Sequence, residues 1–266
     1  MNGIVKEHIL STLAKGTRFD GRKFDAYREI TIERGISPKS AEGSVRVCIG
    51  ETEVVAGVKF GVGTPYPDSP DEGTIMVNME LSPLASPEFE SGPPSIQSIE
   101  LARVVDRPIR ESGALDFKKL CITKGEKCWM VFIDIYPIND AGNLFDAAAL
   151  AALAALMDAK YPKLEKDQVV YGELTNKKLI SDPLPMSCTV YKIGKELIID
   201  PTNTEEAVID ARLTVGVAAD GKICALQKGG EESLKPEDIK KITDLAFKKV
   251  KEIRKVLDGA YKVRKG

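Results

Sequence analysis

The run DAAALAALAALMDA, residues 146–159, constrains the fold more than any other segment of the chain. Apolar residues lie on every side of the helix that this run predicts, so most of its surface has to avoid water. Such a helix is stable when it packs between two layers of structure. The nearly continuous apolar run CWMVFIDIYPI, residues 128–138, predicts a central strand of a sheet that is covered on both faces. The sequence therefore predicts a layered protein with one helix in its interior.

Alternating apolar residues predict β-hairpins in both halves of the chain. In VRVCIGETEVVAG, residues 45–57, the alternation flanks a turn at Gly50, and in CTVYKIGKELIIDPT it flanks a turn at Gly194. A further hairpin turns at Asp220-Gly221. The last helix is predicted from Pro236 to about Leu257, with apolar residues three or four apart. We predict an α+β fold built from two similar units.

The boundaries of these units follow from changes in composition. The first unit takes residues 1–165, with a leading helix that stops at Gly16, and the second takes residues 184–266. Residues 166–183 are expected to connect them. Residues 61–73 are rich in Gly, Pro and Asp, so they predict a long exposed loop.

Composition restricts the chemistry that the chain can perform. Its 266 residues include 38 Lys and Arg against 40 Asp and Glu, so attraction for a polyanion has to come from local clusters. The one histidine, His8, has no neighbouring nucleophile, which argues against a histidine triad or a histidine zinc site. Five cysteines without a CxxC pair predict free thiols.

Motifs for cofactors and membranes are missing from the sequence. It contains neither a GxxxxGK[ST] loop nor a GxGxxG motif after a strand, and its charged beginning predicts neither a signal peptide nor a membrane span. We expect a cytoplasmic protein with no cofactor, no bound metal and no membrane contact.

The helix predicted in SIELARVVDRPIRES, residues 98–112, gathers three arginines on one face, opposite an apolar face. They are Arg103, Arg107 and Arg110. Because Pro108 lacks an N–H group, we expect the helix to kink or end there, which places the first two arginines better than the third. Glu100 and Asp106 stand at helical spacing and could pair with them. The stripe is therefore either a solvated face or a row of cations for phosphate groups.

Two further clusters of polar residues invite a chemical interpretation. The turn Asp140-Ala141-Gly142 precedes the buried helix, whose N-terminus could hold phosphate, but no Arg, Lys, Ser or Thr occurs in residues 138–148. A structural turn is favoured there. Four acids follow the strand LIID, and they either bind Mg²⁺ or form a solvated loop with Arg212 as partner. These acids are Asp200, Glu205, Glu206 and Asp210.

Taken in order, several motifs resemble those of the RNase PH family over nearly the whole chain. They are RFDGR, AEGSVRVCIGETEVV, PYPDSPDEG, NMELSPLASPEFESGPPS, IELARVVDRPIRES and LFDAAALAALAAL. Within the family the chain is most similar to the non-catalytic ring subunit of archaeal exosomes. The resemblance implies the RNase PH fold, which is similar to ribosomal protein S5 domain 2, with two pseudo-repeated βαβα units.

The resemblance also implies partners. They are a catalytic RNase PH-like subunit, which completes a hexameric ring of three heterodimers, RNA-binding cap subunits, and single-stranded RNA. The activity that it implies for the complex is 3′-to-5′ phosphorolytic degradation of RNA.

The chain departs from the pattern of catalytic family members at two places. Their turn continues with Thr or Ser and then Arg, which hold the attacking phosphate, whereas this chain has Asn143 and Leu144. A leucine cannot supply charge-assisted hydrogen bonds to an oxyanion. Two aspartates six residues apart in catalytic members correspond to Glu206 and Arg212 here. The resemblance therefore implies that this chain has no catalytic residues of its own.

Three hypotheses remain. In the first, the chain is a non-catalytic subunit, and its arginines hold RNA beside the active site of a neighbouring subunit, which the matching helix faces in the family. In the second, it is an active phosphate-dependent 3′-to-5′ exoribonuclease whose acids are Glu205, Glu206 and Asp210. In the third, it is an interaction protein that has lost RNA binding. The first is favoured, because the arginines persist where the catalytic residues do not.

Overall fold

The computed structural model describes residues 3–166, 168–180 and 184–262. Residues 167 and 181–183 of the expected connection lie outside the described residues. The helices are α1 (Gly3–Ala14), α2 (Ile96–Glu111), the 3₁₀ helix η1 (Phe117–Leu120), α3 (Leu144–Asp158), α4 (Asn203–Glu206) and α5 (Pro236–Lys262). The strands are β1 (Ile30–Arg34), β2 (Gly43–Ile49), β3 (Thr52–Gly63), β4 (Thr74–Met79), β5 (Cys121–Thr123), β6 (Lys127–Asn139), β7 (Lys160–Glu165), β8 (Gln168–Lys178), β9 (Met186–Ile193), β10 (Glu196–Ile199), β11 (Ala211–Val217) and β12 (Ile223–Gly229).

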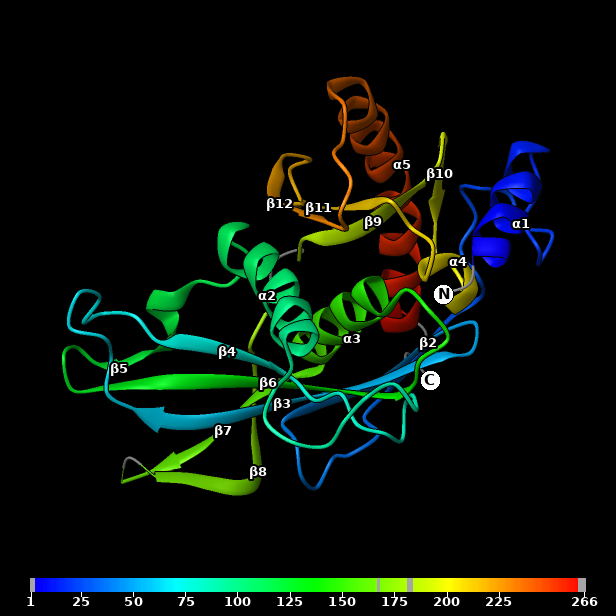
Figure 1. Cartoon of the computed structure of the whole chain (residues 1–266). Coiled ribbons are helices and arrows are strands. Elements are labelled where there is room, and N and C mark those ends of the chain that lie inside the picture. Colours follow the sequence, from blue (N-terminus) through cyan, green and yellow to red (C-terminus); the bar gives the residue numbers. More distant parts are fainter. Residues whose placement is uncertain (1–2, 167, 181–183, 263–266) are drawn as a thin grey trace.

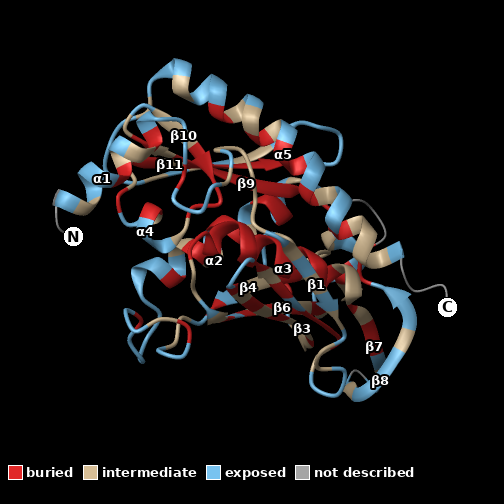
Figure 2. Cartoon of the chain, turned by 90° about the vertical axis from the view of Figure 1, so that its right-hand side faces the viewer, coloured by how far each residue is buried: buried red, intermediate tan, exposed pale blue. Residues whose placement is uncertain are grey.

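Sheets and helices alternate in layers. The larger sheet has the strand order β1-β2-β3-β6-β4, with β5 paired to β6, and the smaller sheet has the order β10-β9-β11-β12. Helices α2 and α3 lie between these two sheets, and α5 covers the other face of the smaller sheet (Figures 1 and 2). Most strand pairs are antiparallel, but β4 runs parallel to β6. The α+β fold is thus confirmed.

Helix α3 occupies the interior position that its composition predicts. Each residue from Leu144 to Leu156 is buried, against β2 and β3 on one side and β9 on the other (Figure 2). Alanines keep the helix thin, so the strands approach closely. At Gly43 of β2 an added Cβ atom would lie 2.4 Å from the carbonyl oxygen of Ala155, which explains the glycine there.

Strand β6 is central in the larger sheet, as predicted, but it is not covered equally on both faces. Residues such as Val131 and Ile133 are buried beneath the helices, whereas Met130 and Phe132 on the outer face are half-buried. Tyr136 on that face is 43% exposed. The prediction of a strand covered on both faces was therefore wrong, because no described helix lies over the outer face (Figure 1).

The predicted hairpin turns are confirmed. Gly50, Gly194 and Gly221 have φ angles of 58°, 62° and 86°, a region that glycine enters without steric cost. Within the expected connection 166–183, residues 168–178 form β8, which pairs with β7 as a separate hairpin. Helix α5 extends beyond the predicted end at Leu257 to Lys262.

Of the two outcomes predicted at Pro108, a kink or an end of the helix, the structure contradicts the end. Helix α2 continues to Glu111, and the Ser112 N–H donates to the Pro108 carbonyl at 3.1 Å. Pro108 is buried and packs beside Gly216 of β11, so tertiary packing offsets the hydrogen bond that the proline lacks. The arginine stripe therefore lies on one continuous helix.

Candidate nucleic-acid interface

The three arginines of α2 lie on its exposed face, as the sequence predicts. The opposite face is apolar and buried, with Leu101, Val104, Val105 and Ile109. Within the described part of the chain, Arg103 and Arg107 have no hydrogen-bond or ion-pair partner. These two guanidinium groups are free to bind an anion.

The two acids at helical spacing to the stripe pair with neither Arg103 nor Arg107 in the described structure. Glu100 accepts a hydrogen bond from Nη2 of Arg212, with 2.6 Å between the atoms. Asp106 pairs with Nε of Arg110 at 2.8 Å, which is the i,i+4 pair of a solvated helix face. The contacts therefore neutralise Arg110 and leave Arg103 and Arg107 as cations.

Arg110 differs from the other two arginines. Besides its ion pair with Asp106, it donates from Nη2 to the carbonyl of Ile75 on β4. Its guanidinium also lies over the ring of Phe117, 5.9 Å from the centroid. Arg110 therefore fixes α2 against β4, and its charge is partly balanced by a carboxylate.

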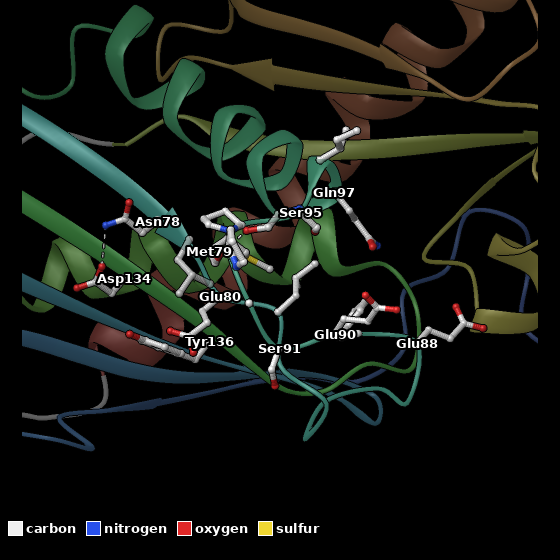
Figure 3. Close-up of a pocket in the computed structure, with 18 residues that line it drawn as sticks. Asn78, Met79, Glu80, Glu88, Glu90, Ser91, Ser95, Gln97, Asp134 and Tyr136 are labelled. Carbon is white, nitrogen blue, oxygen red and sulfur yellow. Dashed lines mark hydrogen bonds between the residues drawn. The ribbon is translucent and has the colours of Figure 1, made fainter.

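Two cavities border α2, and their charges differ. The larger, about 780 Å³, is lined by Glu80, Glu88, Glu90 and Asp134, so it repels a polyanion (Figure 3). Burial, with Asp134 and Glu80 nearby, raises the pKa of Tyr136 in this cavity. The smaller, about 500 Å³, lies between β4 and α2 and is lined by Arg103 and Arg110. We call this smaller cavity the α2–β4 groove, and it is the cavity suited to a phosphate group.

The turn before α3 is held by the protein itself. Arg28 donates from Nη1 to the Ala141 carbonyl at 2.8 Å and from Nη2 to the Gly142 carbonyl at 3.0 Å. Asn143 has φ of 61° and is fully buried, and its side chain bonds Tyr191, Asp146 and Asp200. Leu144 is buried as well. These contacts fit the structural turn that the sequence favours.

Glu206 occupies the N-terminus of α3. Its Oε2 accepts a hydrogen bond from the Asn143 N–H at 2.8 Å. Burial raises the pKa of Glu206 to about 7 and Asp140 adds to the rise, while the Asn143 bond and the cations Arg212 and Arg28 lower it. Because Glu206 already takes the Asn143 N–H, this donor at the helix N-terminus is not open to a second anion.

The other acids of this region are bound to separate partners. Glu205 forms a buried ion pair with Arg18, with 2.8 Å between Oε1 and Nε. Asp200 is buried and pairs with Arg22 at 2.8 Å and with Arg28 at 2.7 Å. Asp210 pairs with Lys6 at 3.0 Å and accepts from the Gly194 N–H.

The expectation of a solvated acidic loop with Arg212 as partner was wrong. Arg212 pairs with Glu100 and lies over the Phe145 ring, 4.3 Å from its centroid. Three of the acids pair instead with cations from the first thirty residues of the chain, and Glu206 accepts the Asn143 N–H. No group of three His, Cys, Asp or Glu among the described residues could hold a metal ion.

Sequence reasoning missed a buried polar network between the two sheets. Asp146 of α3 accepts from the Tyr27 hydroxyl at 2.7 Å and from the Thr189 N–H at 2.8 Å, and burial raises its pKa to about 6. Through Asn143 this network reaches Asp200. The available signal was Asp146, a charged residue in the first turn of a largely apolar helix.

His8 packs beside an aromatic residue. Its ring lies 5.2 Å from that of Phe19. All five cysteines are free thiols, as predicted. Among the helices of the described residues, none combines the length and the apolar character that a membrane crossing needs.

The layered α+β fold with its two sheets defines a protein of the RNase PH type, and the chain belongs to the 3′ exoribonuclease family. Domain 1 of that family matches residues 26–162, and domain 2 matches residues 184–249. The resemblance carried by the sequence motifs is thereby confirmed.

Particular relatives are similar over almost the whole chain. "Exosome complex component Rrp42" of Methanosarcina acetivorans is 47% identical over 249 residues, which cover 94% of this chain and 91% of that protein. The protein of the same name from Thermococcus gammatolerans is 47% identical, covering 97% and 95%.

Two solved structures are similar in fold as well as in sequence. A chain of "archaeoglobus fulgidus exosome with RNA bound to the active site" superposes with a TM-score of 0.86 at 44% identity, covering 95% of this chain and 97% of that one. A chain of "Archaeal exosome core" gives a TM-score of 0.85 at 41% identity, covering 96% of each.

Proposed function

We propose that this chain is a non-catalytic, RNA-binding subunit of an archaeal exosome. It acts beside a catalytic RNase PH-like subunit in 3′-to-5′ phosphorolytic RNA degradation. One observation carries the proposal: Arg103 and Arg107 stand unpaired on α2, while Glu206 fills the anion position at α3. Among the described residues, the chain thus offers free cations for an RNA backbone, whereas Glu206 takes the position at α3 that a phosphate would need.

The lack of catalysis is supported by the separate contacts of the acids. Glu205 and Asp210 each neutralise a different cation, and Glu206 is bound to a backbone N–H. A general acid or a metal site needs groups that converge on one reacting atom. The alternative, an exonuclease using Glu206 and Asp210, lacks this convergence.

RNA binding is supported by the spacing and freedom of the arginines. Side chains four residues apart on a helix stand one above the other, about 5–6 Å apart at Cβ. This spacing suits two neighbouring phosphates of a single strand. Such contacts add affinity without reading sequence. Arg110, held by Asp106 and Ile75, serves as a third and weaker contact.

The partners follow from the similar structures and from exposed sheet edges. We propose a hexameric ring with the catalytic RNase PH-like subunit, capped by RNA-binding subunits, in the cytoplasm. Strands β4 and β12 are edge strands of their sheets. Unpaired backbone groups at such edges can pair with a related chain.

A phosphorolysis assay tests the proposal. Labelled single-stranded RNA in inorganic phosphate is incubated with the purified chain, with the catalytic subunit, and with both. We expect shortening only where the catalytic subunit is present. Shortening by this chain alone, abolished by Asp210→Asn, would establish the second hypothesis instead.

Crosslinking of RNA to the assembled ring tests the arginines. We expect Arg103→Glu with Arg107→Glu to reduce crosslinking to this chain and to slow degradation. The control is Arg46→Glu, because Arg46 is an exposed arginine that is already paired with Glu33 and Glu53. Unchanged crosslinking in the double variant would support the third hypothesis, in which the chain is an interaction protein that does not bind RNA.

A further inference from the structure

The α2–β4 groove holds an aromatic side chain that the proposed function does not use. Tyr66 lies in the loop before β4, lines the groove with Arg103 and Ile99, and is 58% exposed. Its hydroxyl has no hydrogen-bond partner in the described part of the chain. A large exposed aromatic ring beside a free cation requires an explanation.

The local sequence fixes the backbone of this tyrosine. Tyr66 stands between Pro65 and Pro67 in the run TPYPDSP. Each proline fixes its own φ angle, and the second also restricts the residue before it. The Ser69 N–H donates to the Tyr66 carbonyl at 3.0 Å, and the loop ends at Gly73, whose N–H bonds Phe117. The backbone at Tyr66 therefore has little conformational freedom to lose on binding.

The charges in the groove favour an anionic ligand. Asp106 is the carboxylate of the groove, and Arg110 neutralises it. Arg103 then remains as an uncompensated positive charge. The rest of the lining is mainly apolar, with Ile75, Val77, Ile99 and Ala102. A ligand that fits has one flat apolar part and one negative part, which is the chemistry of a nucleotide.

We propose that the groove binds one nucleotide of single-stranded RNA, with its base stacked on Tyr66 and its phosphate on Arg103. This assignment rests on the proposed function and adds a base-binding residue to it. The volume of about 500 Å³ is within the range of small-molecule sites. Because every base has an aromatic face, the site binds without sequence preference.

The experiment distinguishes the contribution of base stacking to RNA affinity from the contribution of the phosphate contact. Fluorescence anisotropy measures the affinity of the complex with the catalytic subunit for labelled RNA and for an abasic oligomer of equal length and charge. Four variants are compared with the natural chain: Tyr66→Ala, Tyr66→Phe, Arg103→Glu and Tyr171→Ala. Tyr171 is a matched control, since it is an exposed tyrosine on β8.

We expect Tyr66→Ala to weaken RNA binding on the order of 5- to 150-fold, the effect of losing one stacked base. Tyr66→Phe and Tyr171→Ala retain the affinity, and Tyr66→Ala leaves the abasic oligomer unaffected. Arg103→Glu weakens binding of both oligomers.

Two outcomes would overturn the assignment. If Tyr66→Ala binds RNA as well as the natural chain while Arg103→Glu does not, stacking is wrong and the proposed function stands. If neither variant changes RNA affinity, both the stacking and the arginine contact are wrong.

Discussion

Replacing Glu206 by glutamine tests whether this half-buried carboxylate at the N-terminus of α3 has a raised pKa. Glutamine keeps an oxygen that accepts the Asn143 N–H, but it never ionises. The pKa of Glu206 is raised from 4.5 to about 7, mainly by burial. One pKa unit corresponds to about 1.4 kcal/mol, so the ionised carboxylate costs the folded state at most about 3 kcal/mol.

The direction in which the free energy of unfolding changes with pH follows from how tightly each state binds the Glu206 proton. Between pH 4.5 and 7 the folded protein holds the Glu206 proton more tightly than the unfolded chain does. The free energy of unfolding therefore falls as pH rises through this range and levels off above pH 7. Glu206→Gln removes this loss, so we expect the variant to be more stable by about 1–3 kcal/mol at pH 8 and nearly equal at pH 4.5.

Urea denaturation followed by circular dichroism at both pH values measures the effect. The neighbouring variant Glu205→Gln is the control, because it leaves Arg18 buried without its partner. That variant should lose about 3–5 kcal/mol at pH 8, the opposite sign. The reasoning would be refuted if the Glu206→Gln protein were less stable than the natural chain at pH 8, or if the stability difference between the two proteins were the same at both pH values.

Three further predictions concern packing, binding and the buried network. Gly43→Ala should lower the free energy of unfolding by about 1–3 kcal/mol and lower Tm, since its Cβ would meet the Ala155 carbonyl, whereas the control Gly57→Ala on the neighbouring strand β3 would meet only the Ala41 side chain at ordinary contact distance. Arg103→Glu with Arg107→Glu should reduce the slope of log affinity against log salt by about 0.7 for each lost phosphate contact, and an unchanged slope contradicts the contacts. Asp200→Asn should cost about 3–5 kcal/mol by denaturation, because it leaves Arg22 and Arg28 without their shared carboxylate.

The features that the sequence predicts well are those that depend on neighbours in the chain. Turns at Gly50 and Gly194 follow from local alternation, and the burial of α3 follows from its own composition. Features that depend on distant residues were missed. Glu205 is 187 residues from Arg18 in sequence, so no local pattern predicts their ion pair.

Pro108 shows how packing can override a local rule. The proline weakens α2, yet its ring packs beside Gly216, and the helix continues to Glu111. The position of the arginine stripe was predictable from helical spacing alone. That Arg103 is unpaired was not predictable, because this depends on the ion pair between Glu100 of α2 and Arg212 of the smaller sheet.

The ion pair between Arg212 and Glu100 connects strand β11 to helix α2. Arg212, which stands where the resemblance places a catalytic aspartate, binds Glu100 of α2 at 2.6 Å. Glu100 lies three residues before Arg103 on the helix, so without Arg212 it would be close enough to pair with Arg103. The residue that departs from the catalytic pattern therefore also keeps Glu100 away from Arg103.

Arg212→Met retains apolar contact with Phe145 and releases Glu100. We expect RNA affinity to fall about 2-fold, the effect of one exposed helix ion pair formed on the stripe. Adding Glu100→Gln should restore the affinity, because no acid is then left to pair with Arg103. If the double variant binds as weakly as Arg212→Met alone, Arg212 itself contributes to RNA binding and the indirect effect through Glu100 is wrong.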